Sequence, residues 1–475
     1  MKLRILGSAT LALAGTVLTC LATDSRQPPP PRFQVPPGFF VEKVAGPPLV
    51  RYPLFACFDD RGRLFVAEGT GTNLPGEELE RKKLGRILLL EDTDGDGVFD
   101  KSTVFADGLI FAQGVLWHDG ALYCASHPSL WKLEDPEGRG VATRRTELLT
   151  GFRFNGNGCD VHGPFLGPDG RLYMTDGRHG YRVRTREGAV LEGLAARVWR
   201  CRTDGGEAER LCGGGFDNPV EIAFTADGEP IGTMDQGPGD CLLHYVEGGV
   251  YPMEHPCLQE FVTTGPLLGA VRQYSPVLPS ALCGLTRYRS TAFGPEYRDA
   301  LFSTHYMLHK IVRHTLVPDG STYRALDADF LTTADHDVRL TDVLEDADGS
   351  LLFIDMGGWF TYGFPGNPLP KPEALGAIYR VRRTDAAPVA DPWGKALGLA
   401  KRSPRELVPL LDDPRPAVID QTLARLARLG AVAVPDLEAV LRVLTRTSVQ
   451  ARRNAVWALC RIGGPPARPA LRRAL

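Results

Sequence analysis

A polar turn followed by an apolar strand recurs along most of the chain. The unit is written DDRGRLFVAE (59–68), WHDGALYCAS (117–126), GPDGRLYMTD (167–176), TADGEPIGTM (225–234) and DADGSLLFID (346–355), with FGPEYRDALFST (293–304) as a relative that lacks the Asp-Gly turn. After each turn, apolar and polar positions alternate as in a half-buried strand. A spacing of roughly 50 to 70 residues suits one four-stranded propeller blade with its loops. The pattern predicts a six-bladed β-propeller over residues 38–383, with an irregular all-β multidomain protein as the alternative.

The pattern changes after residue 402, where stripes of Ala, Leu and Arg at helical spacing replace the alternation. PAVIDQTLARLARLG (416–430) aligns without a gap on VQARRNAVWALCRIG (449–463). Such a repeat is typical of an α-solenoid, and residues 403–475, reached through a linker at 384–402, resemble HEAT-type repeats. The predicted fold class is therefore mainly β, a six-bladed β-propeller followed by a short, incomplete α-helical HEAT-like segment.

The HEAT-like segment holds two repeats and the opening of a third, which cannot cap themselves. These helices either dock on the propeller or belong to a longer C-terminal array, and we favour the longer array.

The N-terminus has the pattern of a secretory signal. Basic residues at positions 2 and 4 precede an apolar run over 5–21 that is too short for a stable membrane span. We expect residues 1–22 to be a signal peptide, cleaved after Ala22, and residues 23–37 to be a Pro-rich linker. The protein is then exported to the periplasm or the medium, and lipid attachment at Cys20 is an alternative that would keep it membrane-associated.

Composition and charge narrow the function. The 475 residues include 53 Gly and 38 Pro, which favours strands and turns, and the formal net charge of −3 argues against general nucleic-acid binding. Residues 401–475 hold 14 Lys and Arg against 6 Asp and Glu. This basic surface is either solvated or a docking surface for the acidic propeller or a partner. Nucleotide cofactors are not expected, because neither a Walker-type loop nor a dinucleotide-binding glycine pattern occurs.

Removal of the signal leaves nine cysteines, an odd number for an exported protein. At least one thiol is therefore free or pairs with another chain. Cys201 and Cys212 flank an Asp-Gly-Gly turn and could form a disulfide across a hairpin, but two buried free thiols are an equally open alternative.

The run DTDGDGVFD at 92–100 has the spacing of a calcium loop. Four carboxylates and one backbone carbonyl would supply the oxygen ligands that calcium prefers: Asp92, Asp94, Asp96, Asp100 and Val98. Thr103 stands where an EF-hand has its bidentate Glu, so the loop instead resembles the calcium-binding hairpins of other propellers. A solvated Asp-Gly turn is the alternative, although four close carboxylates repel one another without a cation.

A histidine near a carboxylate, in GCDVHGP, suggests a proton acceptor. His162 stands at the start of a strand that would line the central face of the propeller, and Asp160 could orient its ring. His179, in DGRHG, would be a second polar group at the same place. A turn histidine with only a structural role is the alternative.

Two further motifs resemble one known family. NPVEIAFTADG (218–228), followed by DQGPGD (235–240), is similar to the soluble quinoprotein glucose and aldose sugar dehydrogenases, six-bladed propellers that bind calcium and pyrroloquinoline quinone. RLTDVLEDADG (339–349) resembles the strand whose arginines clamp the cofactor, which implies this role for Arg339. The resemblance implies cofactor contacts from four more residues, two of them offering carbonyls to calcium: Asn218, Gln236, Gly237 and Pro238.

The chain departs from that family at four positions. Asp217 replaces the arginine before Asn-Pro, and Thr341 replaces a second clamping arginine. Met307 falls where a cofactor-binding lysine is expected. Ungapped counting back from the next Gly-Pro-Asp places Cys159, rather than His162, at the catalytic histidine.

Longer segments, among them PPGFFVEKVAG and GRILLLEDTDGDGVFD, are similar to a bacterial family named membrane-bound dehydrogenases, over about 38–475. Its members join such a propeller to HEAT-like repeats and often to a C-terminal c-type cytochrome. The resemblance implies a separate electron carrier here, possibly such a cytochrome. This sequence has no Cys-X-X-Cys-His motif, so no covalent haem is expected in the chain.

Three functions stay open. The first is an oxidoreductase of the glucose/sorbosone dehydrogenase type, in which His162 takes the hydroxyl proton of a sugar or alcohol and hydride passes to the quinone while Arg339 balances the developing charge. The second is a non-catalytic platform that binds a glycan or a protein. The third is a calcium-dependent hydrolase or lyase with a metal in the tunnel, whose ligands or acids would be Asp160, Asn218, Asp235 and His162.

Overall fold

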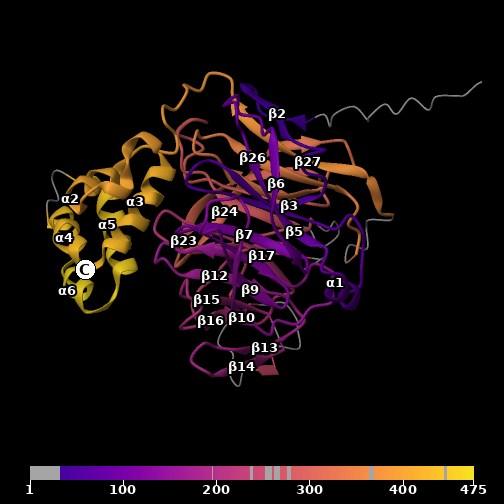
Figure 1. Ribbon diagram of the computed structural model, residues 1–475, viewed down its shortest axis with the longest axis horizontal. Coiled ribbons are helices and arrows are strands. Elements are labelled where there is room, and N and C mark those ends of the chain that lie inside the picture. The colour runs from indigo at the N-terminus through magenta and orange to yellow at the C-terminus, as the bar shows by residue number, and fades with distance from the viewer. Residues whose placement is uncertain are drawn as a thin grey trace, which may run out of the picture. The chain divides into compact units, whose positions relative to one another are not determined.

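The computed structural model describes residues 33–194, 196–235, 239–251, 259–260, 268–274, 280–362, 369–442 and 447–474 (Figure 1). The predicted signal peptide, most of the Pro-rich linker and three cofactor positions, Gln236, Gly237 and Pro238, lie outside these residues. The chain divides into two units, Met1–Pro31 and Arg32–Leu475, and the described residues all belong to the second.

Six antiparallel sheets, each built on four strands, follow one another along the chain and confirm the predicted six-bladed propeller. From the inner strand outward, blades one to three are β3 (Pro53–Phe58), β4 (Leu64–Glu68), β5 (Gly85–Glu91) and β6 (Lys101–Leu109); β7 (Ala112–His118), β8 (Ala121–Ser126), β9 (Ser129–Glu134) and β10 (Arg144–Thr150); and β11 (Val161–Leu166), β12 (Leu172–Asp176), β15 (Arg197–Cys201) and β16 (Glu209–Gly213).

Blades four to six are β17 (Asn218–Phe224), β18 (Pro230–Asp235), β19 (Cys241–His244) and β20 (Arg272–Gln273); β21 (Leu282–Arg287), β22 (Leu301–His305), β23 (Lys310–Asp319) and β24 (Thr322–Thr333); and β25 (Leu340–Glu345), β26 (Leu351–Gly358), β27 (Lys371–Arg383) and β2 (Phe39–Ala45). Three smaller additions are β1 (Phe33–Gln34), which pairs with β24, the hairpin of β13 (Tyr181–Arg184) and β14 (Val190–Gly193), and α1 (Gly76–Lys82).

The repeated Asp-Gly turn joins the inner strand of a blade to its second strand. Its glycine has a positive φ, for example 81° at Gly62, 78° at Gly170 and 97° at Gly228, a conformation that favours glycine over residues with a side chain. In the first blade, the Asp59 carboxylate accepts the N–H groups of Arg61 and Arg63 at 2.8 and 2.9 Å and so fixes the turn. The period read from the sequence is therefore the period of these turns.

The N-terminal strand closes the ring. β2 is the outermost strand of the sixth blade, and it pairs antiparallel with β27 from Phe39↔Arg383 to Ala45↔Ile378. Its Phe39 ring also packs edge-on against Phe293, with centroids 4.9 Å apart, in the apolar layer between the fifth and sixth blades. The first strand of the propeller thus completes its last blade.

Every inner strand has a register shift near its start, and hydroxyl groups satisfy carbonyls there. Thr175 donates to Pro219 O at 2.6 Å and Thr233 donates to Cys283 O at 2.6 Å. Each of these bonds crosses from one blade to the inner strand of the next. Threonine side chains therefore tie neighbouring blades together where the strand ladder is interrupted.

The C-terminal helices confirm the HEAT-like segment. They are α2 (Pro404–Leu407), α3 (Pro416–Leu429), α4 (Val434–Arg442), α5 (Val449–Ile462) and α6 (Gly464–Ala474), with short 3-10 turns at Lys395–Leu397, Leu399–Lys401, Val408–Asp412 and Gly430–Ala433. Ser403 and Glu406 form a capping box at the start of α2. The helices bury their own apolar core, which includes Leu407, Leu426 and Leu459.

The helices dock on the propeller, the alternative that the sequence analysis disfavoured. Asp420 of α3 receives two hydrogen bonds from the Arg289 guanidinium at 2.9 and 2.7 Å. Arg453 of α5 lies 3.1 Å from the Asp227 carboxylate, and Arg428 pairs with Asp119. Part of the basic surface of residues 401–475 therefore contacts acidic propeller turns.

Cys201 and Cys212 are buried free thiols, so the disulfide left open by the sequence does not form. In the β15–β16 ladder Cys212 lies opposite Val198, three residues from Cys201. All eight cysteines among the described residues are free.

A threonine that hydrogen-bonds across two blades should contribute more to the free energy of unfolding than one that caps a surface turn. We expect Thr233→Val to lower the free energy of unfolding by about 1–3 kcal/mol, because it leaves Cys283 O and the Glu221 N–H without their buried partner. Thr225→Val, whose hydroxyl accepts only the Glu229 N–H in a partly exposed turn, is the control and should cost less than half as much. Denaturant unfolding measures both, and equal losses would contradict the role given to Thr233.

Candidate active site

The strongest candidate site lies at the end of the central tunnel where the inner strands begin, called here the upper mouth. The opposite end, where the inner strands finish and the helices dock, is called the lower mouth. β11 of the third blade and β17 of the fourth blade start side by side and bring His162 and Asn218 to the upper mouth. The loop at 155–160 precedes β11 and supplies the remaining groups on that side.

His162 is buried and held by one nitrogen. Its Nε2 lies 3.0 Å from Gly158 O and 3.1 Å from Asn218 Oδ1, two acceptors, so Nε2 carries the proton and donates. Nδ1 then has a free lone pair, and it is buried with no hydrogen-bond partner among the described residues. Burial lowers the pKa of His162 to about 4, so the ring is neutral near pH 7. His162 is thus an imidazole poised to accept a proton at Nδ1.

Asp160 does not orient His162, contrary to the sequence prediction. Its Oδ2 accepts a hydrogen bond from Gln113 Nε2 of the second blade at 3.2 Å, and its Oδ1 lies 3.9 Å from His179 Nε2. Asp160 precedes β11 and turns toward the second blade, while His162 turns toward the fourth. Burial raises the pKa of Asp160 to about 7. Asp160 and His179 are therefore a second polar pair beside the imidazole, as the sequence suggested for His179 alone.

Asn218 links His162 to a carboxylate. Its Nδ2 donates to Asp235 Oδ2 at 3.3 Å, which orients its Oδ1 toward the imidazole. The neighbouring Asp217 accepts two hydrogen bonds from Arg178 Nη1 at 3.0 and 2.9 Å. The departure from arginine at position 217 thus makes an ion pair at the edge of the mouth instead of a free cation.

Cys159, the position that ungapped counting aligned with a catalytic histidine, is a buried thiol. Burial, with Asp235 and other nearby carboxylates, raises its pKa well above the usual value. Its N–H donates to Asn157 Oδ1, which also lies 3.1 Å from His179 Nε2. A neutral thiol in this position serves packing. His162, in the polar cluster, is instead the residue with the chemistry of a proton acceptor.

Arg339 lies in the sixth blade, across the tunnel from the third. Its N–H donates to Asp355 Oδ1 at 2.9 Å, and its guanidinium donates to His336 O and lies 5.6 Å from the centre of the Tyr306 ring. The described contacts do not bring it to His162. Arg339 and His162 therefore face the upper mouth from opposite sides.

Two other departures from the quinoprotein pattern serve the fold. The Thr341 hydroxyl donates to Leu54 O at 2.7 Å, another tie between blades. Met307 packs against the central apolar cluster, which contains the buried rings of Tyr306, Trp359 and Phe360.

The predicted calcium loop lies between β5 and β6, on the outer half of the first blade. The Asp92, Asp94 and Asp96 carboxylates come within 4.8 Å of one another, as a cation site requires. Asp100 is apart from them, because its Oδ2 accepts the Thr93 hydroxyl at 2.6 Å. Val98 was predicted to offer its backbone carbonyl, and in the structure its backbone N–H donates to Asp96 Oδ1 at 2.7 Å. Three of the four predicted carboxylates are therefore brought together, and they lie in an outer hairpin.

The sequence did not indicate Gln113 or the Gly158 carbonyl. Gln113, in FAQGVLW, has no motif around it, and its place becomes evident only when the second blade lies beside the third. The Gly158 carbonyl points at His162 because the loop turns at this glycine, where φ is 89°. The run of glycines in NGNGCD was the one available signal.

The sequence matches one family model over most of its length and a second one at its C-terminal end. Residues 30–358 match the family model described as Domain of unknown function (DUF7133), and residues 451–475 match the PBS lyase HEAT-like repeat. No curated protein matches the sequence.

Solved structures share the architecture. A protein assigned as an oxidoreductase (glucose dehydrogenase) from Thermus thermophilus is 20% identical, with a TM-score of 0.50 over 72% of this chain and 100% of that one. A glucose dehydrogenase is 15% identical, with a TM-score of 0.50 over 72% and 99%. The calcium structure of a Trichoderma reesei protein of Carbohydrate-Active Enzymes Family AA12 is 12% identical, with a TM-score of 0.50 over 76% and 99%. At these identities the likeness shows the fold, in agreement with the predicted resemblance.

The buried Asp160 carboxyl should make stability depend on pH. Its folded pKa of about 7 lies above the ordinary 3.8, so the folded protein keeps a proton that the unfolded chain has lost. This group therefore costs stability increasingly as the pH rises from about 4 to about 7, and the cost is constant above that. We expect Asp160→Asn to raise the free energy of unfolding by about 1–3 kcal/mol at pH 8 and by almost nothing at pH 4.

Denaturant unfolding at pH 4, 6 and 8 checks this expectation. Asp107→Asn, at an exposed carboxylate paired with Arg145, is the control and should leave the pH profile unchanged. A gain for Asp160→Asn that is the same at all three values would show that the carboxyl is ionised throughout.

Proposed function

The chain belongs to the family described as Domain of unknown function (DUF7133), and from its upper mouth we propose that it oxidises a hydroxyl group of a sugar or related alcohol, with His162 as proton acceptor. The observation that carries the proposal is the buried, unpartnered Nδ1 of a neutral imidazole. Oxidation of an alcohol to a carbonyl removes a proton from oxygen and a hydride from carbon. Asn218 and Gly158 O hold the ring so that Nδ1 can take that proton.

The polar groups around His162 suit a hydroxylated substrate. Asp160 Oδ1 is also buried without a hydrogen-bond partner among the described residues, and a substrate hydroxyl would satisfy it. A carboxyl with a pKa of about 7 can accept or donate there, depending on its protonation. Two orphaned polar atoms at the same mouth therefore favour a ligand that brings hydroxyl groups.

The hydride needs an acceptor, and pyrroloquinoline quinone, as the resemblance implies, would supply a two-electron acceptor when bound. The orphaned atoms of His162 and Asp160 fit its reacting side, with Asn218 and Arg339 as the described residues that would hold it. Gln236, Gly237 and Pro238 are proposed to complete that set. Electrons would then pass to a separate carrier, and a c-type cytochrome is the proposed class.

Calcium is proposed at the outer hairpin, with Asp92, Asp94 and Asp96 as ligands. Within the described residues this is the one place where three such groups come together, which gives no support to a hydrolase or lyase with a metal in the tunnel. Calcium at the hairpin would brace the first blade and take no part in the reaction.

Export is part of the proposal, since residues 1–22 have the signal pattern, and the periplasm or the medium is the proposed location. Among the described residues, no helix is both long and apolar enough to cross a membrane.

A second function, recognition of a glycan or a protein without redox chemistry, is favoured by one observation. Three positions where the quinoprotein pattern has basic cofactor residues, at Asp217, Met307 and Thr341, are committed to an ion pair, apolar packing and a tie between blades. The quinone experiment below separates the two functions.

The oxidoreductase is tested on residues 23–475 with pyrroloquinoline quinone, with and without calcium. Binding is followed by calorimetry, and reduction of a dye is measured over a panel of sugars and alcohols. We expect saturable quinone binding, and His162→Ala should lower the rate about a hundred-fold or more while the quinone still binds. His244→Gln, at a buried histidine on β19 of the fourth blade, is the control and should keep the rate. No binding at micromolar quinone would overturn the oxidoreductase and leave recognition.

The calcium hairpin is tested separately by thermal unfolding. We expect calcium to raise the melting temperature of the wild type, and Asp94→Asn to weaken this effect at least ten-fold in calcium concentration, because it removes one of three clustered carboxylates. Asp135→Asn, in another surface turn whose single carboxylate caps the Arg139 and Gly140 N–H groups, is the control. Equal responses of the wild type and Asp94→Asn to calcium would contradict the site.

A further inference from the structure

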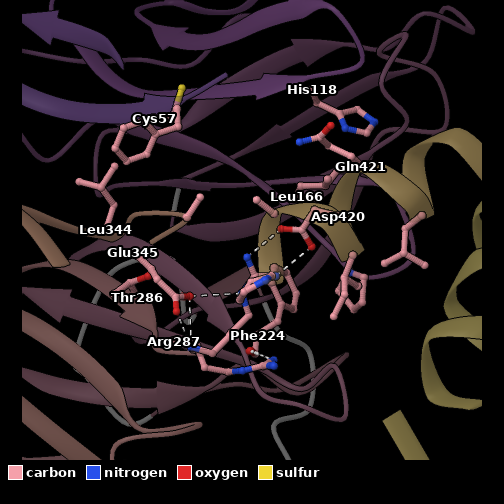
Figure 2. Close-up of a pocket in the computed structure, with 18 of the residues that line it drawn as sticks. Cys57, His118, Leu166, Phe224, Thr286, Arg287, Leu344, Glu345, Asp420 and Gln421 are labelled. Atoms are coloured by element: carbon pink, nitrogen blue, oxygen red, sulfur yellow. Dashed lines mark hydrogen bonds and ion pairs between the residues drawn. The ribbon is translucent and has the colours of Figure 1, made fainter. Parts of the chain in front are cut away.

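A cavity lies at the lower mouth, between the propeller and the docked helices. It has a volume of about 710 Å³, within the roughly 300–1,000 Å³ typical of small-molecule sites. The final residues of all six inner strands line it, and α3 and α5 form the opposite wall. In Figure 2, Asp420 projects from α3 toward the strand ends that carry Thr286 and Arg287, and Gln421 projects toward the side that carries His118. The cavity is partly open to solvent at its rim.

Most charged groups of this cavity neutralise one another. Arg289 binds Asp420 with two hydrogen bonds and lies 3.5 Å from Glu345, as Figure 2 shows in part by dashed lines. Further pairs join lining residues to partners in or beside the cavity: Arg287–Asp299, Arg428–Asp119, Arg453–Asp227, Arg380–Asp346 and Arg415–Asp413. A small ion would find few charges free to bind it, so the lining favours a ligand without net charge.

Some polar groups of the lining stay free. The Arg425 Nε is buried without a hydrogen-bond partner among the described residues. The His118 ring is partly buried beside charged groups and makes no hydrogen bond to a described residue. Gln421 uses only its Nε2, which donates to Trp393 O at 3.0 Å. Burial lowers the pKa of His118 to about 4, so the ring is neutral. The three side chains offer both donors and acceptors from two walls of the cavity.

Two carboxyl groups form the deep end of the cavity. Glu221 of β17 and Asp342 of β25 are 8% and 4% exposed. Each uses one oxygen to accept a backbone N–H of a neighbouring blade, from Leu285 and from Ala56. The second oxygen of Glu221 has no hydrogen-bond partner among the described residues, and the side chain lines the cavity. A hydroxyl group is the ligand group that suits a buried carboxyl oxygen of this kind.

Three indole rings complete the lining. Trp117, Trp393 and Trp457 are partly buried and border the cavity. Each is held in place, since Trp117 stacks on Phe65 and the other two lie against the turn glycines Gly62 and Gly228, where a Cβ would meet their rings at 2.5 Å. Rigid indoles offer flat apolar faces at low entropic cost.

We propose that the lower-mouth cavity binds a short neutral oligosaccharide. Sugar hydroxyls would donate to Glu221 and Gln421 and accept from Arg425, while the C–H faces of the rings would pack on the indoles. Phosphorylated ligands do not fit, because the buried carboxyl groups of Glu221 and Asp342 line the cavity and most of its arginines are already paired. The site is formed jointly by the HEAT-like segment and the propeller. The inference does not rest on the proposed oxidation, since it uses other residues at the other mouth.

The test uses residues 23–475 with maltotriose, cellotriose and N,N′,N″-triacetylchitotriose, and with glucose 6-phosphate as a charged comparison. Calorimetry and tryptophan fluorescence measure binding. We expect at least one trisaccharide to bind and to change the fluorescence, and Gln421→Ala and Arg425→Ala each to weaken that binding ten-fold or more. His162→Ala and Arg468→Ala, the latter at an exposed position of α6, are controls that should leave it unchanged.

Three results would overturn the proposal. These are the absence of binding by all three trisaccharides at millimolar concentration, binding that survives both cavity variants, and tighter binding of glucose 6-phosphate than of any neutral sugar. Trisaccharide binding that His162→Ala abolishes would place the sugar at the upper mouth and would also overturn it. Thermal unfolding of each variant establishes that it folds, and because quinone binding is measured separately, failure here leaves the upper mouth unaffected.

Discussion

The antiparallel pairing of β2 with β27 holds the ring closed, and both mouths of the tunnel depend on it. A propeller made of consecutive blades has two free ends, and each would expose the apolar face of a blade. Here the strand that leads into the first blade is also the outer strand of the sixth, so hydrogen bonds close the circle. The spacing between blades is thereby fixed, and side chains can reach reliably from one blade to the next.

The chemistry of the upper mouth uses that spacing. Asp160 and His162 are two residues apart, yet their partners are Gln113 in the second blade and Asn218 in the fourth. A small change in the angle between blades would break one contact or the other. The threonine hydrogen bonds also span neighbouring blades. The contacts that stabilise the fold and those that orient the imidazole therefore depend on the same angle between blades.

The sequence predicted what is periodic or local. The Asp-Gly period gave the six blades, the offset between 416–430 and 449–463 gave the HEAT-like helices, and the carboxylates of 92–96 do come together, because all of these depend on neighbours in the chain. The partners of Asp160 and the docking of the helices could not be predicted, since they depend on which loops meet across blades. Asp100 lies apart from this cluster for a local reason, because its carboxylate accepts the Thr93 hydroxyl.

The turn glycines have a consequence for how force passes through the molecule. Trp393, Arg461 and Trp457 lie against Gly62, Gly170 and Gly228, which belong to the first, third and fourth blades. Three blades therefore rest on side chains from one C-terminal region, Trp393 of the linker and Trp457 and Arg461 of α5. A force that would push these blades apart at the lower mouth is therefore shared by three contacts with the C-terminal region, which helps the ring to resist widening there.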